Sequence, residues 1–180
     1  AAFKGCLNDG GTAGSCLTIT GTDTARPATV YISANDGMLH AFNGDTGVER
    51  WGFIPNILMP KLYRLADKAY TTAANHQWMV DGSPIVGDIH DGTKWRTILV
   101  GGLNSGGRGY YAIDVTNPVK PIALWEFNVR TTGSCTSAVG DTNDCDLGLS
   151  YGNPIISKLG NGNWVGMFPS GYNNVSPGDG

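Results

Sequence analysis

Short runs of apolar, β-branched and aromatic residues recur along this chain, separated by turns rich in Gly, Asn, Asp and Pro. The clearest set of runs occupies residues 83–89, 96–101, 109–115 and 122–128. Runs of this length and composition between such turns predict β-strands. The Asp-Gly pair at 91–92 suits a tight hairpin, which needs residues that tolerate positive φ. The pattern therefore predicts a four-stranded antiparallel meander.

This set of runs is itself repeated. The sequence GSPIVGD at 82–88 returns as GNPIISK at 152–158, 70 residues later. An earlier copy joins at its second strand, where TVYI at 29–32 parallels TILV at 97–100. Repetition of short strands at such a period predicts a β-propeller, in which each copy is one blade.

We therefore predict an all-β fold in which blades of four antiparallel strands form an incomplete ring across residues 1–180. The predicted blades cover approximately residues 17–55, 82–129 and 149–180, the last of them truncated. Two modules and a fragment do not close a ring, and ring closure is what hides sheet edges. The chain is therefore expected to be a piece that needs the rest of a parent propeller. Further strands are expected at 29–34, 38–43 and 153–159.

A helical insertion is predicted between the first two blades, over residues 56–81. Its segment 56–67 places four apolar residues on one helical face: Ile57, Leu58, Leu62 and Leu65. This helix is expected to pack over an edge or the rim of the blades, with a partner-binding role as the alternative.

Composition excludes several classes of protein. The chain is 41% apolar and 15% charged, with a net charge of −3. Nucleic-acid and anionic-membrane binders need clustered Lys and Arg, so neither partner is expected. A transmembrane segment is not expected either, because no apolar run approaches the ~20 residues that a membrane helix needs. The chain begins Ala-Ala-Phe, without Met or a signal peptide, and is expected to be a processed or excised segment.

Four cysteines form two equally spaced pairs in polar loops. Cys6 and Cys16 bound the loop 6–16, and Cys135 and Cys145 bound the loop 135–145. Local pairing predicts two disulfides and hence an oxidising compartment. A zinc site of four cysteines is the alternative, although the usual spacing of two to four residues within each pair is absent.

The sequence gives only weak signals for catalytic or metal-binding residues. The best cation candidate is a run of oxygen-bearing side chains, Asp141, Asn143, Asp144 and Asp146. Cys145 interrupts this run and no Glu closes it, so a solvated disulfide loop is the preferred interpretation. Three histidines fall on separate elements without ligand spacing, namely His40, His76 and His90. No catalytic, cofactor-binding or metal residue is predicted.

Several motifs carry a family resemblance. VYISANDGMLHAFN at 30–43, followed by Thr46, Gly47 and Trp51, resembles the repeat of quinoprotein-type β-propellers. WGFIP at 51–55, VDGSPIVGD at 80–88 and the stretches 95–103 and 106–115 resemble the C-terminal propeller of the PilC/PilY tip-associated adhesins of bacterial type IV pili. The resemblance runs in order over residues 28–174.

This resemblance implies a non-enzymatic protein of type IV pilus biogenesis and tip adhesion. The implied partners are pilin or minor pilin proteins and surface receptors. The implied location is the pilus tip or outer membrane, reached by export through the periplasm. The family's calcium loop lies downstream of the matching segment, so calcium is implied only for the parent domain.

Two other functions remain open. A periplasmic quinoprotein-like dehydrogenase would need a carboxylate base, such as Asp81, Asp88 or Asp114, and commonly has an adjacent Cys pair, which is absent here. Those aspartates recur at strand ends, where Asp commonly stabilises turns. A propeller scaffold for outer-membrane assembly is the third possibility.

Partner contact is assigned to aromatic and polar residues that break the repeat. Trp51 matches Trp125, and Trp95 matches Trp164, so these four are expected to serve blade packing. The predicted partner-binding residues have no such counterpart: Tyr63, Tyr70, His76, Gln77, Trp78, Arg108 and Tyr172.

Overall fold

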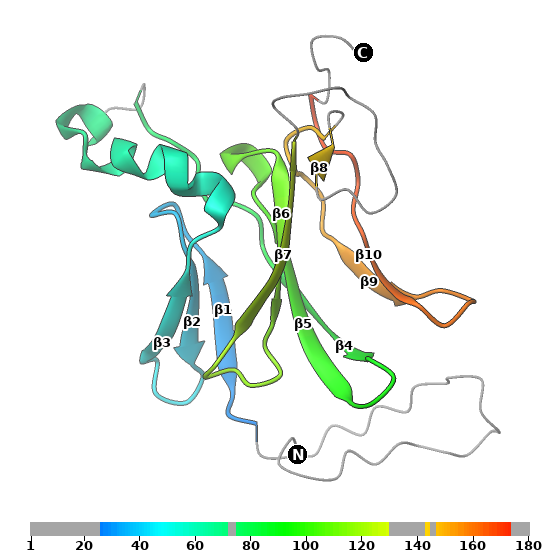
Figure 1. Ribbon diagram of the computed structural model, residues 1–180. Coiled ribbons are helices and arrows are strands. Elements are labelled where there is room, and N and C mark those ends of the chain that lie inside the picture. Colours follow the sequence, from blue (N-terminus) through cyan, green and yellow to red (C-terminus); the bar gives the residue numbers. More distant parts are fainter. Residues whose placement is uncertain (1–25, 72–74, 130–142, 145–146, 174–180) are drawn as a thin grey trace.

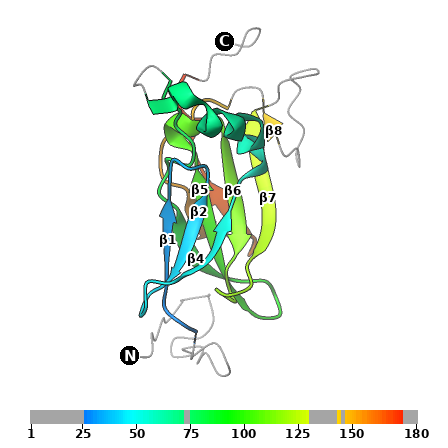
Figure 2. The same ribbon diagram turned by 90° about the vertical axis from the view of Figure 1, so that its left-hand side faces the viewer.

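Three β-sheets follow one another along the chain in a computed structural model that describes residues 26–71, 75–129, 143–144 and 147–173 (Figure 1). The first sheet contains β1 (Thr29–Ser33), β2 (Leu39–Asn43) and β3 (Glu49–Phe53). The second contains β4 (Ile85–His90), β5 (Trp95–Gly102), β6 (Gly109–Asp114), β7 (Ile122–Val129) and β8 (Asn143–Asp144). The third contains β9 (Ile155–Lys158) and β10 (Trp164–Met167). Figure 2 looks onto the first sheet, with the second behind it.

The predicted all-β class is confirmed. Consecutive strands pair antiparallel from β1 to β3, from β4 to β7, and between β9 and β10. One pairing is not antiparallel: β8 pairs with β7 in parallel, through Asn128 to Asn143 and Val129 to Asp144. These two residues of β8 fall where a solvated loop was predicted. β7 would otherwise leave its outer backbone groups unpaired at a sheet edge, which explains why a returning segment joins it.

The first two sheets share an irregularity at the same position. Ala41 pairs with Trp51 between β2 and β3, and Ala112 pairs with Trp125 between β6 and β7. In both sheets the register shifts immediately after the alanine. A β-bulge adds a residue to one strand and increases the local twist. The two sheets are therefore copies of one blade design.

Pairing also corrects the alignment of the repeats. Ala41 pairs with Tyr31, and its counterpart Ala112 pairs with Val100. Tyr31 therefore corresponds to Val100, whereas the sequence motifs align it with Leu99. A shift of one residue moves a side chain to the opposite face of a strand. The hydrophobic pattern of the sequence did not reveal this shift, because Leu99 and Val100 are both apolar.

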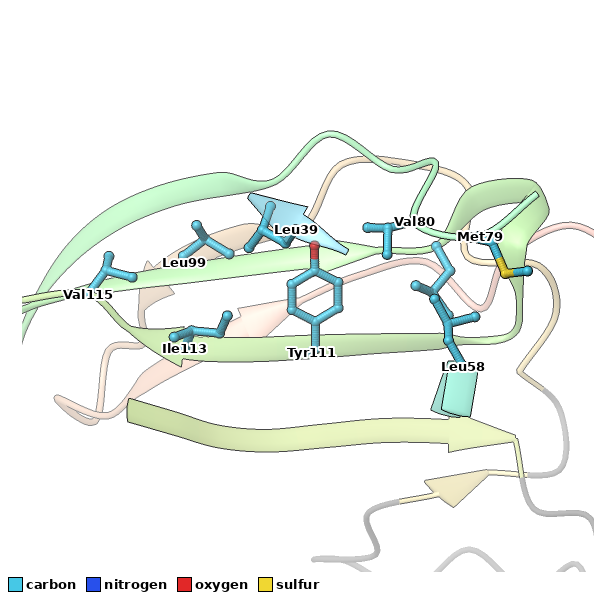
Figure 3. Close-up of a cluster of buried hydrophobic side chains, with 9 residues drawn as sticks. Leu39, Leu58, Met79, Val80, Leu99, Tyr111, Ile113 and Val115 are labelled. Carbon is cyan, nitrogen blue, oxygen red and sulfur yellow. The ribbon is translucent and has the colours of Figure 1, made fainter. Parts of the chain in front are cut away.

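The main core lies between the first and second sheets (Figure 3). It joins side chains from both sheets and from the insertion: Leu39, Leu58, Met79, Val80, Leu99, Leu103, Tyr111, Ile113 and Val115. Phe53 packs against Tyr111 with 5.5 Å between ring centroids. Trp51 Nε1 donates a hydrogen bond to the Pro118 carbonyl at 2.8 Å, which fastens β3 to the β6–β7 turn.

The contact between the second and third sheets is smaller. Its buried centre is Ile98, Val100 and Ala112, with Ile156 packed from β9. An open apolar cleft of about 140 Å³ remains between these sheets, lined in part by Trp125. Trp125 is 37% exposed, so its predicted packing role is only partly realised. In the described chain the third sheet has two strands, and it offers no turn equivalent to the one that binds Trp51.

The predicted helical insertion forms two 3₁₀ helices, η2 (Asn56–Ala66) and η3 (Lys68–Thr71). Leu58 is fully buried, and Ile57 and Leu65 pack against the main core, as the apolar face predicted. Pro60 lies inside η2, where it lacks the N–H that a helix would use. The insertion lies across one end of the first two sheets (Figure 1). Of the helices in the described ranges, none is long and apolar enough to cross a membrane.

Candidate functional site

Loops and helices gather at one end of the sheets, the upper end in Figure 1. They comprise the described part of the insertion 56–81, the loop 103–108 with the short helix η4 (Asn104–Gly106), and the segments 147–152 and 170–173. We call this end the rim surface. The predicted partner-binding residues all lie in these segments, although the structure does not test their role.

Four of those residues form one cluster in the insertion. The Tyr70 hydroxyl donates a hydrogen bond to the Gln77 carbonyl at 3.2 Å. The His76 ring lies 5.8 Å from the Tyr70 ring and contacts Trp78 edge-on at 4.9 Å between centroids. Trp78 is 50% exposed, while the next residue, Met79, is fully buried. The chain therefore presents a large aromatic side chain immediately beside a fixed anchor in the core.

Tyr63 lies on η2, outside this cluster. It is 70% exposed, and the Arg64 guanidinium lies 5.8 Å from its ring centroid. A cation placed over an aromatic face is favourable and restricts both side chains. Tyr63 is therefore a further exposed aromatic side chain of the insertion, with a positive charge close to its ring.

A second aromatic group lies near the described C-terminal end. Tyr172 is 69% exposed and contacts Tyr151 edge-on at 6.3 Å. The Tyr151 hydroxyl is hydrogen-bonded to the Ser105 hydroxyl. Arg108 donates to the Asn173 carbonyl at 2.9 Å. Sequence reasoning missed Tyr151, although it occupies the repeat position of Asp81 and so breaks the repeat.

Helix η4 packs against the insertion. A Cβ on Gly106 would lie 1.6 Å from the Met79 carbonyl oxygen, so only glycine fits at this approach. The Lys61 ammonium donates to the Gly106 carbonyl at 2.6 Å. Asn104, at φ 47°, donates through its side chain to the Asp81 carbonyl at 3.2 Å. The loop 103–108 is thereby held against η2 and against Met79 and Asp81, which follow Trp78; we call residues 78–81 the Trp78 segment.

The same loop is fixed to the segment 147–152 through a buried serine. Ser150 Oγ accepts a hydrogen bond from the Leu103 amide at 2.8 Å and donates to the Gly107 carbonyl at 3.1 Å. Ser150 is fully buried. The cluster around Trp78 and the pair of Tyr151 and Tyr172 are the two aromatic groups of the rim surface. They therefore belong to one connected structure, with η4 between them.

Among the described residues, three cations of the rim surface form no ion pair with a carboxylate. Within the described ranges, ion pairs join His40 to Asp36 and Glu49, and Arg96 to Asp91 and Asp114. None of these ion pairs includes the rim cations Lys61, Arg64 or Arg108. Burial, followed by the nearby Arg64 charge, lowers the pKa of Lys61. Lys61 and Arg108 instead donate hydrogen bonds to backbone carbonyls, those of Gly106 and Asn173.

Two of the three carboxylates considered for catalysis, Asp88 and Asp114, have structural partners. Burial opposes ionisation of Asp114, but hydrogen bonds from Thr116 and Arg96 outweigh it and lower the pKa of this carboxyl. Asp88 accepts a hydrogen bond from the Thr97 hydroxyl at 2.5 Å. In the described part of the chain, no group of three or more His, Cys, Asp and Glu side chains could hold a metal ion.

Some predicted sites cannot be placed. The four cysteines, Cys6, Cys16, Cys135 and Cys145, lie outside the described residues, as do Asp141 and Asp146. The disulfide loops 6–16 and 135–145 therefore stay predictions. The blade boundaries stay predictions as well.

The N-terminus of η2 is bound by a carboxylate from the second sheet. Glu126 on β7 accepts the Asn56 amide at 2.7 Å and the Ile57 amide at 3.1 Å, one with each oxygen. Free amides at a helix start favour a negative charge. Glu126 therefore ties the insertion to the blade that follows it.

Replacing Glu126 with Ala is expected to lower the free energy of unfolding by about 1 to 2 kcal/mol, the range found for lost helix caps. Chemical denaturation would measure this loss. Asp45→Ala is the matched control, because it removes an exposed carboxylate for which the described chain shows no side-chain hydrogen bond. Equal effects from both replacements would show that the carboxylate of Glu126 does not cap η2.

Successive sheets of antiparallel strands, the first two with bulges at equivalent positions, define this chain as a segment of a β-propeller. The family described as PilY1 beta-propeller domain matches residues 7–180, and the chain belongs to this family. The resemblance found in the sequence motifs is thereby confirmed.

Relatives and a solved structure agree with this assignment. The chain is 38% identical over 163 residues to the type IV pilus biogenesis factor PilY1 of Pseudomonas aeruginosa strain PAO1, covering 91% of the chain and 13% of that protein. It is 38% identical over 150 residues to a PilY1 homolog of Xylella fastidiosa, covering 82% of the chain and 9% of the homolog. The crystal structure of the Pseudomonas aeruginosa PilY1 C-terminal domain matches with a TM-score of 0.59 and 37% identity, covering 83% of the chain and 26% of that domain.

Proposed function

We propose that this chain is part of a non-enzymatic protein of type IV pilus biogenesis that binds pilus components through the rim surface. Membership of the PilY1 propeller family supports the biological setting, because the matched relatives are named as type IV pilus biogenesis factors. The chain spans only 9% to 13% of the length of the relatives described above. Adhesion to surface receptors, with exposure at the cell surface or pilus tip, extends the same proposal.

The observation that carries the proposal is the exposed aromatic cluster around Trp78, built beside the buried residue Met79. Energetically important residues of protein interfaces are enriched in Trp, Tyr and Arg. Trp78 directly precedes Met79, which is buried in the core and hydrogen-bonded to Asn35, so little ordering of the backbone at Trp78 is required on binding. A pilin or minor pilin is the proposed partner.

An enzymatic role is less well supported. Asp88 and Asp114, two of the candidate bases, form hydrogen bonds to Thr97 and to Arg96 and Thr116. An Asp that is held in this way stabilises turns and strand ends without needing a substrate. The aromatic cluster, by contrast, has no equivalent in the repeated part of the blades. The geometry therefore favours binding.

Replacing Trp78 with Ala in the full-length protein is expected to weaken association with pilus components by about 2 kcal/mol, or roughly thirtyfold. The fold should persist, because half of this side chain is already exposed. Pull-down affinity and surface piliation would measure the effect, with circular dichroism as the test of folding. Trp95→Ala is the matched control, since Trp95 begins β5 at the opposite end from η4. If Trp78→Ala is folded and binds as before, the proposed binding face is wrong.

A further inference from the structure

His40 lies between two carboxylates. Its Nδ1 is 2.7 Å from Glu49 Oε1 on β3, and its Nε2 is 2.9 Å from Asp36 Oδ2 in the β1–β2 turn. A neutral imidazole has one N–H, and ionised carboxylates can only accept. Both contacts are hydrogen bonds only when both ring nitrogens carry protons. The geometry therefore corresponds to the imidazolium form of His40.

The β1–β2 turn that carries Asp36 also holds the Trp78 segment. Asn35 Oδ1 accepts a hydrogen bond from the Met79 amide at 3.1 Å. On the other side of Asp36, a Cβ on Gly37 would lie 2.5 Å from Leu62 Cδ2 of η2, so this turn and the helix are in close contact. The residue whose amide is bound directly follows Trp78. One hydrogen bond thus connects this turn to the residue that follows the exposed indole.

We propose that His40 is a pH-sensitive positioning residue that holds the β1–β2 turn when doubly protonated and loosens it on deprotonation, so that the presentation of Trp78 depends on pH. This regulation rests on the proposed function of the rim surface. Loss of one ring proton leaves a lone pair facing a carboxylate, which removes one of the two hydrogen bonds. Asp36 or Glu49 is then released.

The direction of the pH dependence follows from the surroundings of the ring. The hydrogen bond to Glu49, and then that to Asp36, outweigh burial and raise the pKa of His40 above its ordinary value. In the described part of the chain, Asp36 and Glu49 are the charged groups that act on it; the paired residues on the adjacent strands are Ile32 and Gly52. A raised pKa makes the stabilisation complete below the unfolded value of about 6.5 and removes it as pH rises through the folded value.

Hydrogen exchange of the segment around Met79, measured in the full-length protein from pH 5.5 to 8.5 and corrected for intrinsic rates, tests this proposal. Protection is expected to fall several-fold as pH rises through the raised pKa of His40. In His40→Gln this fall should disappear. Asp36→Asn keeps an oxygen for the Met38 amide but removes one charge, so the midpoint should move to lower pH. The matched control His90→Gln alters a histidine of the second sheet and should keep the native profile.

Protection that is constant with pH in the native protein, or that falls identically in His40→Gln, would overturn the proposal. Asn35→Ala should leave Met79 unprotected at every pH, which checks the link between the turn and the rim. The two proposals fail separately. If hydrogen exchange does not depend on pH but Trp78→Ala strongly weakens binding, only the proposed role of His40 is wrong. A pH-dependent profile with no defect in Trp78→Ala removes only the binding face.

Discussion

Replacing Leu58 with Ala is expected to lower the free energy of unfolding by about 2 to 5 kcal/mol, the range found for large-to-small changes in cores. Leu58 is fully buried and is the residue of η2 that enters the main core between the first two sheets (Figure 3). Its removal leaves a cavity that β-strands on both sides cannot readily close. Denaturant titration of the domain would measure the loss.

The neighbouring Met59→Ala is the matched control, because it lies on the same helix but is 55% exposed. Its effect should stay within about 0.5 kcal/mol, as for other surface changes. A comparable loss at both positions would mean that η2 responds to helix propensity and not to the packing of one face. A negligible loss at Leu58 would show that the insertion is not anchored in the core.

The blade strands were predictable because their signals are local. The Asp-Gly turn at 91–92 separates β4 from β5, and Gly92 adopts a φ of 96° that few other residues tolerate. The apolar face of η2 was predictable for the same reason, since Leu58 and Leu65 follow helical spacing within one short segment. Repetition then supplied the fold class, because blades of one design recur along the chain.

Contacts between distant segments were not predictable from those signals. Glu126 binds the start of η2 although 70 positions separate it from Asn56 in sequence. The parallel pairing of β8 and the partial exposure of Trp125 depend on what lies beside the edge of β7 and the open cleft. No local sequence pattern predicts which distant segments contact one another in this way.

In the candidate site, too, the contacts between residues close in sequence were predictable and those between distant residues were not. Tyr70, His76 and Trp78 meet because they are close in sequence, and the rule that they break the repeat was sufficient to select them. Ser150 and Gly106 carry no visible signal, since a serine and a glycine in a turn-rich chain are unremarkable. Their importance comes from burial and from backbone approach in the folded chain.

Replacing Gly106 with Ala is expected to affect both stability and binding. The added Cβ would lie 1.6 Å from the oxygen and 2.5 Å from the carbon of the Met79 carbonyl. These are backbone atoms, so neither can rotate away as a side chain would, and η4 or the Trp78 segment has to move. Overpacking of this kind costs about 1 to 3 kcal/mol or more. Denaturation and the pilus-component pull-down would measure the two losses.

Gly160→Ala is the matched control, because a Cβ there meets no atom within 4 Å and its φ is not positive. This replacement should be neutral or slightly stabilising, by up to about 1 kcal/mol, since it restricts the unfolded chain. Gly106→Ala should weaken binding even though Trp78 is retained, because the segment that carries the indole is displaced. If Gly106→Ala binds normally at unchanged stability, η4 does not position the rim surface, and the two aromatic groups would have to act independently.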